Sequence, residues 1–192
     1  MHTEYEAMFT GISPDDIRMK MEALGWVCVK PEFTQRRTTF YLPKWSELTQ
    51  AYLRVRDESD RITLSLKMMW DGEGIDSQKE VELVVNSYAD AVLLHESLGA
   101  VQKAQQETRR EIWEYNGVQV MIDWWPFLDP VVEIEGIDES SVCRVSQELW
   151  FDWSDAIFDS IDVVYSEVYG VSRDRVNNET PKIVFDMNNP FL

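Results

Sequence analysis

Apolar and polar residues alternate with a period of two through most of the first 136 positions of the chain. Successive side chains of a β-strand point to opposite faces, so this period predicts strands with one apolar and one polar face. Turn sequences at residues 57–60, 71–74 and 116–117 separate several of them, and the Asn-Gly pair at 116–117 is a strong hairpin signal. The predicted strands are residues 4–9, 26–30, 36–42, 51–56, 61–70, 79–85, 108–115, 118–124 and 131–136.

Helical spacing of apolar residues appears in four stretches, about residues 14–24, 88–98, 140–149 and 154–169. Ser13 and Ser87 precede the first two stretches as N-caps, and Gly25 and Gly99 follow them as stop signals. The tail, residues 172–192, is polar with a strand-like piece at 182–185, which predicts a peripheral strand or an arm. Hairpins interspersed with helices predict an α+β fold with a mainly antiparallel sheet.

Charged residues recur at i and i+2 inside the predicted strands, so each such pair shares one face. The charged positions are Glu4 and Glu6, Arg54 and Arg56, Glu80 and Glu82, Glu133 and Glu135, with Lys67 and Asp123 placed singly. Such a face either meets water as one side of an open sheet or lines the lumen of a closed or nearly closed antiparallel barrel with helices packed outside. In a lumen, carboxylates would bind Mg²⁺ or Mn²⁺ and the cations would hold phosphate oxygens, a combination that suits a metal-bridged polyphosphate.

The chain of 192 residues carries a formal net charge of -17, which excludes partners that need a basic surface, namely nucleic acids and anionic membranes. The charge is uneven: residues 1–110 have 14 basic and 18 acidic side chains, whereas residues 111–192 have 4 and 17. With 44% hydrophobic residues the chain folds into a core, and we expect one domain over residues 1–192, with tunnel strands at about 3–136 and helices and an arm at about 140–192.

Cys28 and Cys143 lie far apart without metal-ligand spacing, which predicts buried free thiols in a reducing compartment. The chain has no membrane-length apolar run, and its first residues lack the pattern of a signal peptide, so we expect a cytoplasmic protein. His95 falls inside the second predicted helix and is interpreted as a surface residue rather than a catalytic base. The aromatic cluster at residues 124–128 either stacks a substrate ring or forms a hydrophobic plug or subunit contact.

Six segments in order give the chain a resemblance to the CYTH superfamily, the triphosphate tunnel metalloenzymes, and most closely to its bacterial class IV adenylate cyclase-like branch. The segments are Glu4-x-Glu6, Leu53-Arg54-Val55-Arg56, Thr63-Leu64-Ser65-Leu66-Lys67, Glu80-x-Glu82, Arg109-Arg110, and Ile122-Asp123 with Glu133-Ile134-Glu135-Gly136. The resemblance runs from about residue 3 to residue 169, and the ordered set is more specific than any single segment.

The resemblance implies a tunnel of eight antiparallel strands, a divalent-metal-dependent enzyme and a small-molecule triphosphate substrate bound by a monomer or a homodimer. Glu4, Glu6, Lys67 and Asp123 would take part in catalysis. By similarity the metal would be held by Glu4, Glu6, Asp123, Glu133 and Glu135, with Glu80 and Glu82 nearby. By similarity the triphosphate would be bound by Arg54, Arg56, Lys67 and Arg109 or Arg110, since strand parity does not decide between the last two.

Two positions depart from the family pattern: Met8 stands where the family has a lysine, and Gln78 where an arginine is often found. The resemblance favours a cyclase that converts ATP to cyclic AMP and pyrophosphate. A triphosphatase acting on thiamine triphosphate, a nucleoside triphosphate or tripolyphosphate would use the same lumen. The loss of the lysine also permits a non-catalytic nucleotide or polyphosphate binder, and the acidic C-terminal surface permits a protein-interaction module.

Overall fold

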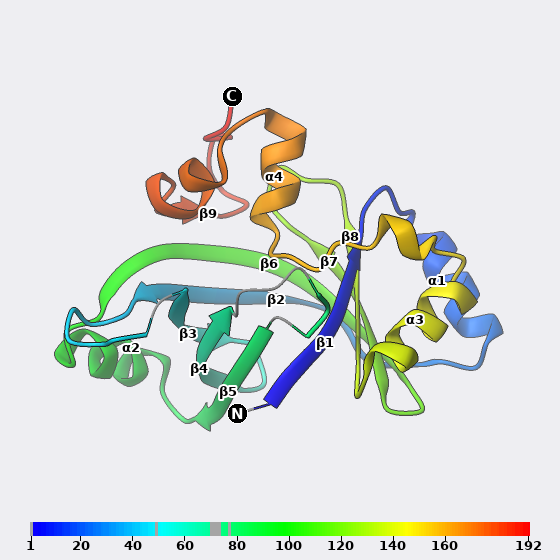
Figure 1. The fold of residues 1–192 in the computed structure, drawn as a ribbon, viewed down its shortest axis with the longest axis horizontal. Helices are drawn as coiled ribbons and strands as arrows, with labels where there is room; N and C mark the ends of the chain where they lie inside the picture. The colour runs from blue at the N-terminus through cyan, green and yellow to red at the C-terminus, as the bar shows by residue number, and fades with distance from the viewer. Residues whose placement is uncertain (1, 49, 70–73, 77) are drawn as a thin grey trace.

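Eight antiparallel strands close into a barrel in the computed structural model, which describes residues 2–48, 50–69, 74–76 and 78–192. The order around the barrel is β2-β3-β4-β5-β1-β8-β7-β6, and pairing of β2 with β6 closes it. The closed α+β barrel with helices outside is the predicted fold (Figure 1). The strands are β1 (His2–Phe9), β2 (Val27–Tyr41), β3 (Ala51–Asp57), β4 (Ile62–Met69), β5 (Gln78–Val85), β6 (Val101–Tyr115), β7 (Val118–Trp124) and β8 (Val131–Gly136).

Two strands are longer than the sequence pattern predicts. The stretches 26–30 and 36–42 are one strand, β2, which continues through Pro31 by means of register shifts at Cys28/Lys30 and Lys30/Phe33. A proline cannot donate a ladder hydrogen bond, so the strand tolerates it only beside such irregularities. Strand β6 begins at Val101 rather than near residue 108, because its first half has polar residues on both faces and shows no alternation.

The structure confirms the predicted hairpin turn at residues 116–117 and the predicted N-caps of the first two helices. Asn116 and Gly117 have φ values of 51° and 78° and join β6 to β7, the geometry that a two-residue hairpin requires. Helices α1 (Pro14–Ala23) and α2 (Tyr88–Ser97) begin after Ser13 and Ser87, whose side chains accept hydrogen bonds from backbone N–H groups of the first turn. Most of the predicted turn at residues 71–74, and the end of the strand predicted over 61–70, lie outside the described residues.

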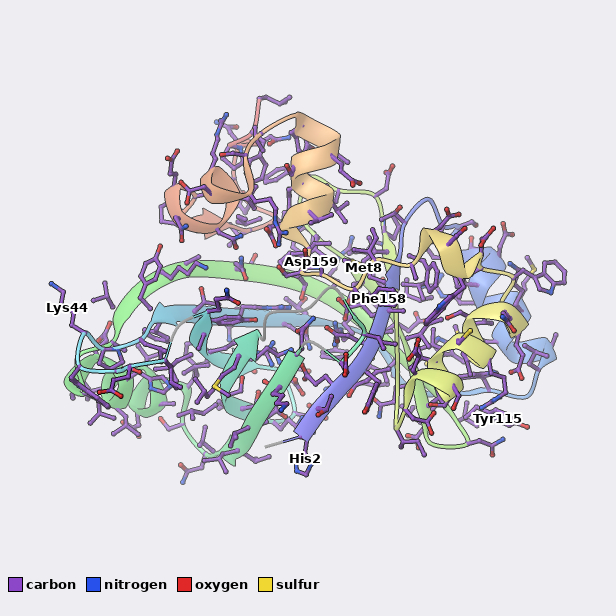
Figure 2. The ribbon with its side chains drawn as sticks, viewed as in Figure 1. His2, Met8, Lys44, Tyr115, Phe158 and Asp159 are labelled. Carbon is purple, nitrogen blue, oxygen red and sulfur yellow. The ribbon has the colours of Figure 1, made fainter. Side chains whose placement is uncertain are left out.

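The prediction of one helix over residues 154–169 is wrong. A 3₁₀ turn at Trp153–Asp155 is followed by an extended piece, and the helix α4 covers only Asp162–Tyr169. The reason is a contact distant in sequence: Ile157 and Met8 exchange both backbone hydrogen bonds, each 2.9 Å long. Figure 2 shows Met8 on β1 beside Phe158 and Asp159.

Three apolar clusters hold the layers together. Helix α1 and helix α3 (Glu139–Glu148) cover the outer faces of β1, β7 and β8, and their interface contains Phe9, Trp113 and Ile134. Helix α2 covers β3 over Phe40 and Val55. The third cluster joins the barrel end to the C-terminal segment, residues 160–192, which comprises α4, the π-helical turn η2 (Arg175–Glu179) and β9 (Lys182–Ile183) above β6 (Figure 1).

Three smaller expectations have different outcomes. His95 is only 5% exposed and packs against Phe40, so the expected surface position is wrong. Both cysteines are free, but Cys28 is exposed and Cys143 is half-buried, so the predicted burial of the two thiols is wrong; Cys28 lies at the start of β2, beside a register shift. Strand β9 pairs in parallel with β6 over two residues, shorter than the predicted 182–185.

Candidate active site in the barrel lumen

A cavity of about 330 Å³ occupies the barrel lumen. Its described lining includes nine acidic and seven basic side chains, contributed by the strands, by Glu58 and Arg61 of the turn between β3 and β4, and by Asp159 and Asp162 of the C-terminal part. The charged positions that alternate along the predicted strands therefore meet in one cavity rather than on an open, solvated face.

The acidic wall of the cavity is built by β1 and β8. Glu6 lies directly opposite Glu135 in the strand register, and Met8 lies opposite Glu133. Gln78, on the other neighbour of β1, donates a hydrogen bond of 2.9 Å to Glu6. Over positions 4–8 of β1 and 133–135 of β8, every second residue thus places a carboxylate in the lumen, except at position 8, where Met8 is uncharged.

Lys67 of β4 connects this wall to β5. Its Nζ lies 2.9 Å from a Glu4 carboxylate oxygen and 3.6 Å from Glu80. Glu80 also accepts a hydrogen bond of 2.8 Å from Arg54. The three charged side chains Glu4, Lys67 and Glu80 form one network in which each strand contributes one member.

The cationic wall is built by β3, where Arg54 and Arg56 point inward together. Arg56 contacts Glu58 at 2.5 Å and Glu82 at 3.3 Å, and both arginines are more than nine-tenths buried. Among the described residues, the Nε atoms of Arg54 and Arg56 have no hydrogen-bond partner. Their fixed position and spare donors suit phosphate oxygens.

The structure distinguishes the two neighbouring arginines of β6. Arg110 points inward and contacts Asp123 at 2.5 Å and Glu133 at 2.6 Å. Arg109 points outward, where it pairs with Glu32 at 2.8 Å and is 44% exposed. Of the two candidates, Arg110 is therefore in the lumen and Arg109 is not.

Crowded carboxylates in the lumen have shifted pKa values. Burial, followed by a hydrogen bond to Glu80, raises the pKa of Glu4 to about 8, although Lys67 opposes the shift. Burial and the Glu133 carboxylate raise the pKa of Asp123 to about 6 against the effect of Arg110. Burial also raises the pKa of Glu6 and Glu135, which lie near one another and near Glu133. With its pKa at about 8, Glu4 retains its proton at neutral pH, whereas the Arg110 guanidinium lowers the pKa of Glu133 despite its burial.

Oxygen donors of this kind fit a divalent metal ion such as Mg²⁺ or Mn²⁺, because hard ions take carboxylate ligands. In the described part of the chain, however, no group of three or more Asp, Glu, His or Cys side chains is already arranged around a common metal position. Lys67 and Arg110 hold Glu4, Asp123 and Glu133. A metal would compete with these two cations for the same oxygens.

Sequence reasoning missed several lumen residues. Arg37, Gln35 and Thr108 form a hydrogen-bonded group on β2 and β6. Glu58 is 3% exposed and pairs with Arg56 and Arg61. Gln35 and Arg37 do have the i, i+2 spacing. However, the neighbouring Arg36 and the two threonines that follow are also polar, so the sequence shows no alternation of polar and apolar residues here.

The aromatic cluster at residues 124–128 contributes to a hydrophobic plug at the barrel end that the C-terminal segment covers. Trp125 is 7% exposed and packs with Met8, Val131 and Tyr165, and the Tyr165 hydroxyl donates to the Pro126 carbonyl at 2.7 Å. Of the alternatives for this cluster, the structure favours the hydrophobic plug.

Comparison with known proteins identifies the family. The model of the CYTH domain matches residues 2–159, which is most of the chain. The chain belongs to the CYTH domain family. No curated protein matches the sequence.

Solved structures share the CYTH fold at low sequence identity. An adenylate cyclase candidate from Vibrio parahaemolyticus superimposes with a TM-score of 0.71 at 14% identity, covering 86% of this chain and 98% of that one. A conserved hypothetical protein from Pyrococcus furiosus has a TM-score of 0.68 at 20% identity, with coverage of 82% and 97%. An adenylyl cyclase candidate from Hippeastrum with a dominant triphosphatase activity has a TM-score of 0.53 at 14% identity, with coverage of 90% and 97%.

The CYTH match ends at Asp159, so the C-terminal segment follows the matched domain. It nevertheless contributes to the lumen through residues 160–162, Tyr165, Val176 and Ile183. Within the described residues, no helix is both long and apolar enough to span a membrane.

Proposed function

We propose that this CYTH protein is a divalent-metal-dependent enzyme that cleaves a phosphoanhydride bond of a small triphosphate-bearing substrate in its lumen. The observation that carries the proposal is one cavity that brings Arg54, Arg56 and Arg110 together with the carboxylates of β1, β5 and β8, with Arg54 in contact with Glu80 and Arg110 in contact with Glu133. A triphosphate bridged to metal is a ligand that needs both signs of charge. The leading reaction is the class IV adenylate cyclase-like one, from ATP to cyclic AMP and pyrophosphate.

Each wall would have a distinct part in the reaction. Arg54, Arg56, Lys67 and Arg110 would bind the phosphate oxygens and neutralise charge that develops at the reacting phosphorus. Glu4, Glu6, Asp123, Glu133 and Glu135 would hold the metal, with Glu80 and Glu82 fixing the cations. Held by these carboxylates, Mg²⁺ or Mn²⁺ would supply Lewis-acid neutralisation of the triphosphate charge. The protein would orient the chain of phosphates and restrict water, so that either a ribose hydroxyl or a water molecule attacks in line.

One observation favours a triphosphatase as the second candidate. A cyclase must hold the nucleoside so that its 3′ oxygen reaches the α-phosphorus. The aromatic residue best placed for base stacking, Trp125, is already covered by the Arg37 guanidinium at 4.8 Å and by Tyr165. Support for the cyclase comes from the family resemblance and from the similarity to the cyclase candidate of Vibrio parahaemolyticus. Support for the triphosphatase comes from the Hippeastrum protein, which has a similar fold and a dominant triphosphatase activity.

Product analysis by phosphorus NMR tests the proposal. The purified protein is incubated with ATP, GTP, thiamine triphosphate or tripolyphosphate and with Mg²⁺ or Mn²⁺. Pyrophosphate with a cyclic nucleotide identifies the cyclase, and orthophosphate with the diphosphate identifies the triphosphatase. Metal chelation and the double variant Glu133→Gln, Glu135→Gln should abolish turnover, whereas Glu114→Gln on the exposed end of β6 should not.

A protein that binds tripolyphosphate but forms no product with either ion would contradict the enzymatic proposal and identify a non-catalytic polyphosphate binder. Binding to basic proteins that weakens steeply with salt, without triphosphate binding, would instead indicate an interaction module.

A further inference from the structure

Arg37 of β2 is a buried cation without an acidic partner. It is 7% exposed, and among the described residues no carboxylate oxygen lies within ion-pair distance of its guanidinium. By contrast, Arg54, Arg56 and Arg110 each contact at least one lumen carboxylate. A buried charge without a counterion is unfavourable, so its presence calls for an explanation.

The contacts of Arg37 fix its orientation but leave donors free. Its Nη2 donates to Gln35 at 3.0 Å and to Thr108 at 2.5 Å, and its guanidinium carbon lies over the Trp125 ring, 4.8 Å from the ring centroid. The buried Nε of Arg37 has no hydrogen-bond partner in the part of the chain that the structure describes. The side chain is thus held rigidly by neutral groups, an arrangement that prepares it for an anion without neutralising it.

The neighbours of Arg37 create a positive potential in that part of the cavity. In the strand register Arg37 lies between Arg56 on β3 and Gln106 on β6, and all three line the cavity. Burial and then the charges of Arg56, Arg54 and Arg110 lower the pKa of Arg37, and the more distant Asp123 carboxylate only partly opposes them. Repulsion of this kind is relieved when an anion binds among the guanidinium groups.

We propose that Arg37 is a substrate-binding residue that pairs with a phosphate group in the lumen, next to Arg56. This inference rests on the proposed function and adds to it a phosphate-binding residue in the plugged half of the barrel. A phosphate oxygen is the ligand class that fits, because it accepts several charge-assisted hydrogen bonds at once. Trp125 then serves to position Arg37 rather than to stack a base.

The test is calorimetric titration of inorganic tripolyphosphate into the metal-free protein, which avoids turnover. Arg37→Met should raise the Kd about tenfold or more, as expected for loss of a charge-assisted contact. Arg37→Lys should bind with intermediate affinity. The matched control is Arg36→Met, since Arg36 is adjacent in sequence but points outward to Asp57 with its side chain 66% exposed; its Kd should stay within about twofold of the unsubstituted protein.

A second measurement separates binding from structural support. Urea unfolding of ligand-free Arg37→Met should show stability equal to or above that of the unsubstituted protein, because an uncompensated buried charge is removed. Gln35 would keep a partner, the Thr108 hydroxyl, which donates to it at 3.1 Å. A clear loss of stability would assign Arg37 a structural role and overturn the inference, as would unchanged tripolyphosphate affinity in Arg37→Met.

The outcomes distinguish this inference from the proposed function. If Arg37→Met binds weakly and the unsubstituted protein binds tripolyphosphate without ever cleaving it, the inference holds and the enzymatic proposal fails. If cleavage occurs and Arg37→Met binds normally, the enzymatic proposal holds and the inference fails. If the unsubstituted protein binds no tripolyphosphate either without metal or with Mg²⁺ or Mn²⁺, both fail.

Discussion

Arg109 and Arg110 are adjacent in sequence but differ in what their charges do. Arg110 neutralises Asp123, which is 1% exposed, whereas Arg109 forms an ion pair on the surface. Arg110→Gln should therefore destabilise the protein by about 3–5 kcal/mol, because it leaves a buried carboxylate without its partner. Arg109→Gln should change stability by less than about 1 kcal/mol. Urea unfolding of both variants checks this, and equal effects would contradict the assignment of Arg110 to the lumen.

Strand parity alone could not predict which arginine points inward. The outer face of β6 includes Glu111, which is 6% exposed and pairs with Arg18, while the inner face includes the apolar Ile112. Both faces of this strand therefore mix charged and apolar residues. Register with β7 settles the matter, since Arg110 lies opposite Asp123. That register depends on the closed barrel and cannot be read from the strand itself.

Glu4 should make the stability of the metal-free protein depend on pH between about 6 and 8. Its pKa is about 8 in the folded protein and has the ordinary value of 4.5 when unfolded, so the folded state binds the extra proton in this range. Stability should consequently fall as pH rises from 6 to 8. Thermal unfolding should show this slope, and Glu4→Gln should reduce it while Glu114→Gln leaves it unchanged.

A divalent ion should act in the opposite direction to this titration. Metal ligands must be deprotonated, so Mg²⁺ or Mn²⁺ should displace the Glu4 proton and bind more tightly at pH 8 than at pH 6. Proton release on metal addition in weakly buffered solution measures the exchange directly. Metal binding that is independent of pH and releases no proton would remove Glu4 from the ligand set.

At the scale of elements, the C-terminal segment follows the matched CYTH domain, packs against one end of the barrel and lines part of the lumen. Tyr165 of α4 is fully buried among Trp125, Val176 and Phe191, whereas Val168 on the same helix is 59% exposed. Tyr165→Ala should cost about 3–5 kcal/mol of stability, as truncation of a buried aromatic side chain does. Val168→Ala should lie within about 0.5 kcal/mol of the unsubstituted protein. Similar unfolding midpoints for the two variants would show that α4 does not pack on the barrel end.

Local patterns predicted those elements that depend on local interactions. The caps at Ser13 and Ser87 and the turn at residues 116–117 fix their own backbone, and they are confirmed. The helix predicted over residues 154–169 is wrong because Ile157 pairs with Met8, which is distant in the chain. Likewise, β2 passes through Pro31 because β6 supplies a long partner strand. Contacts between distant residues decide these cases, and no local pattern contains them.

At the scale of the whole molecule, the charge of -17 describes the exterior more than the site. Seven of the 18 basic side chains line the lumen, namely Arg37, Arg54, Arg56, Arg61, Lys67, Lys103 and Arg110. Their concentration in the cavity leaves an outer surface on which acidic residues dominate. An extended polyanion that stays outside thus meets repulsion, while a short polyanion that enters meets guanidinium groups.

Competition between polyanions of different size should reveal this difference. Tripolyphosphate should bind, whereas duplex DNA at the same phosphate concentration should neither bind nor displace it, because the duplex cannot enter a cavity of about 330 Å³. Fluorescence anisotropy of labelled DNA, with calorimetry for tripolyphosphate, measures both. Added salt should weaken tripolyphosphate binding, since the contacts are charged, but it should not produce DNA binding. DNA binding that depends on Arg54 or Arg110 would mean that the basic residues are accessible from outside and that the lumen does not select its ligand by size.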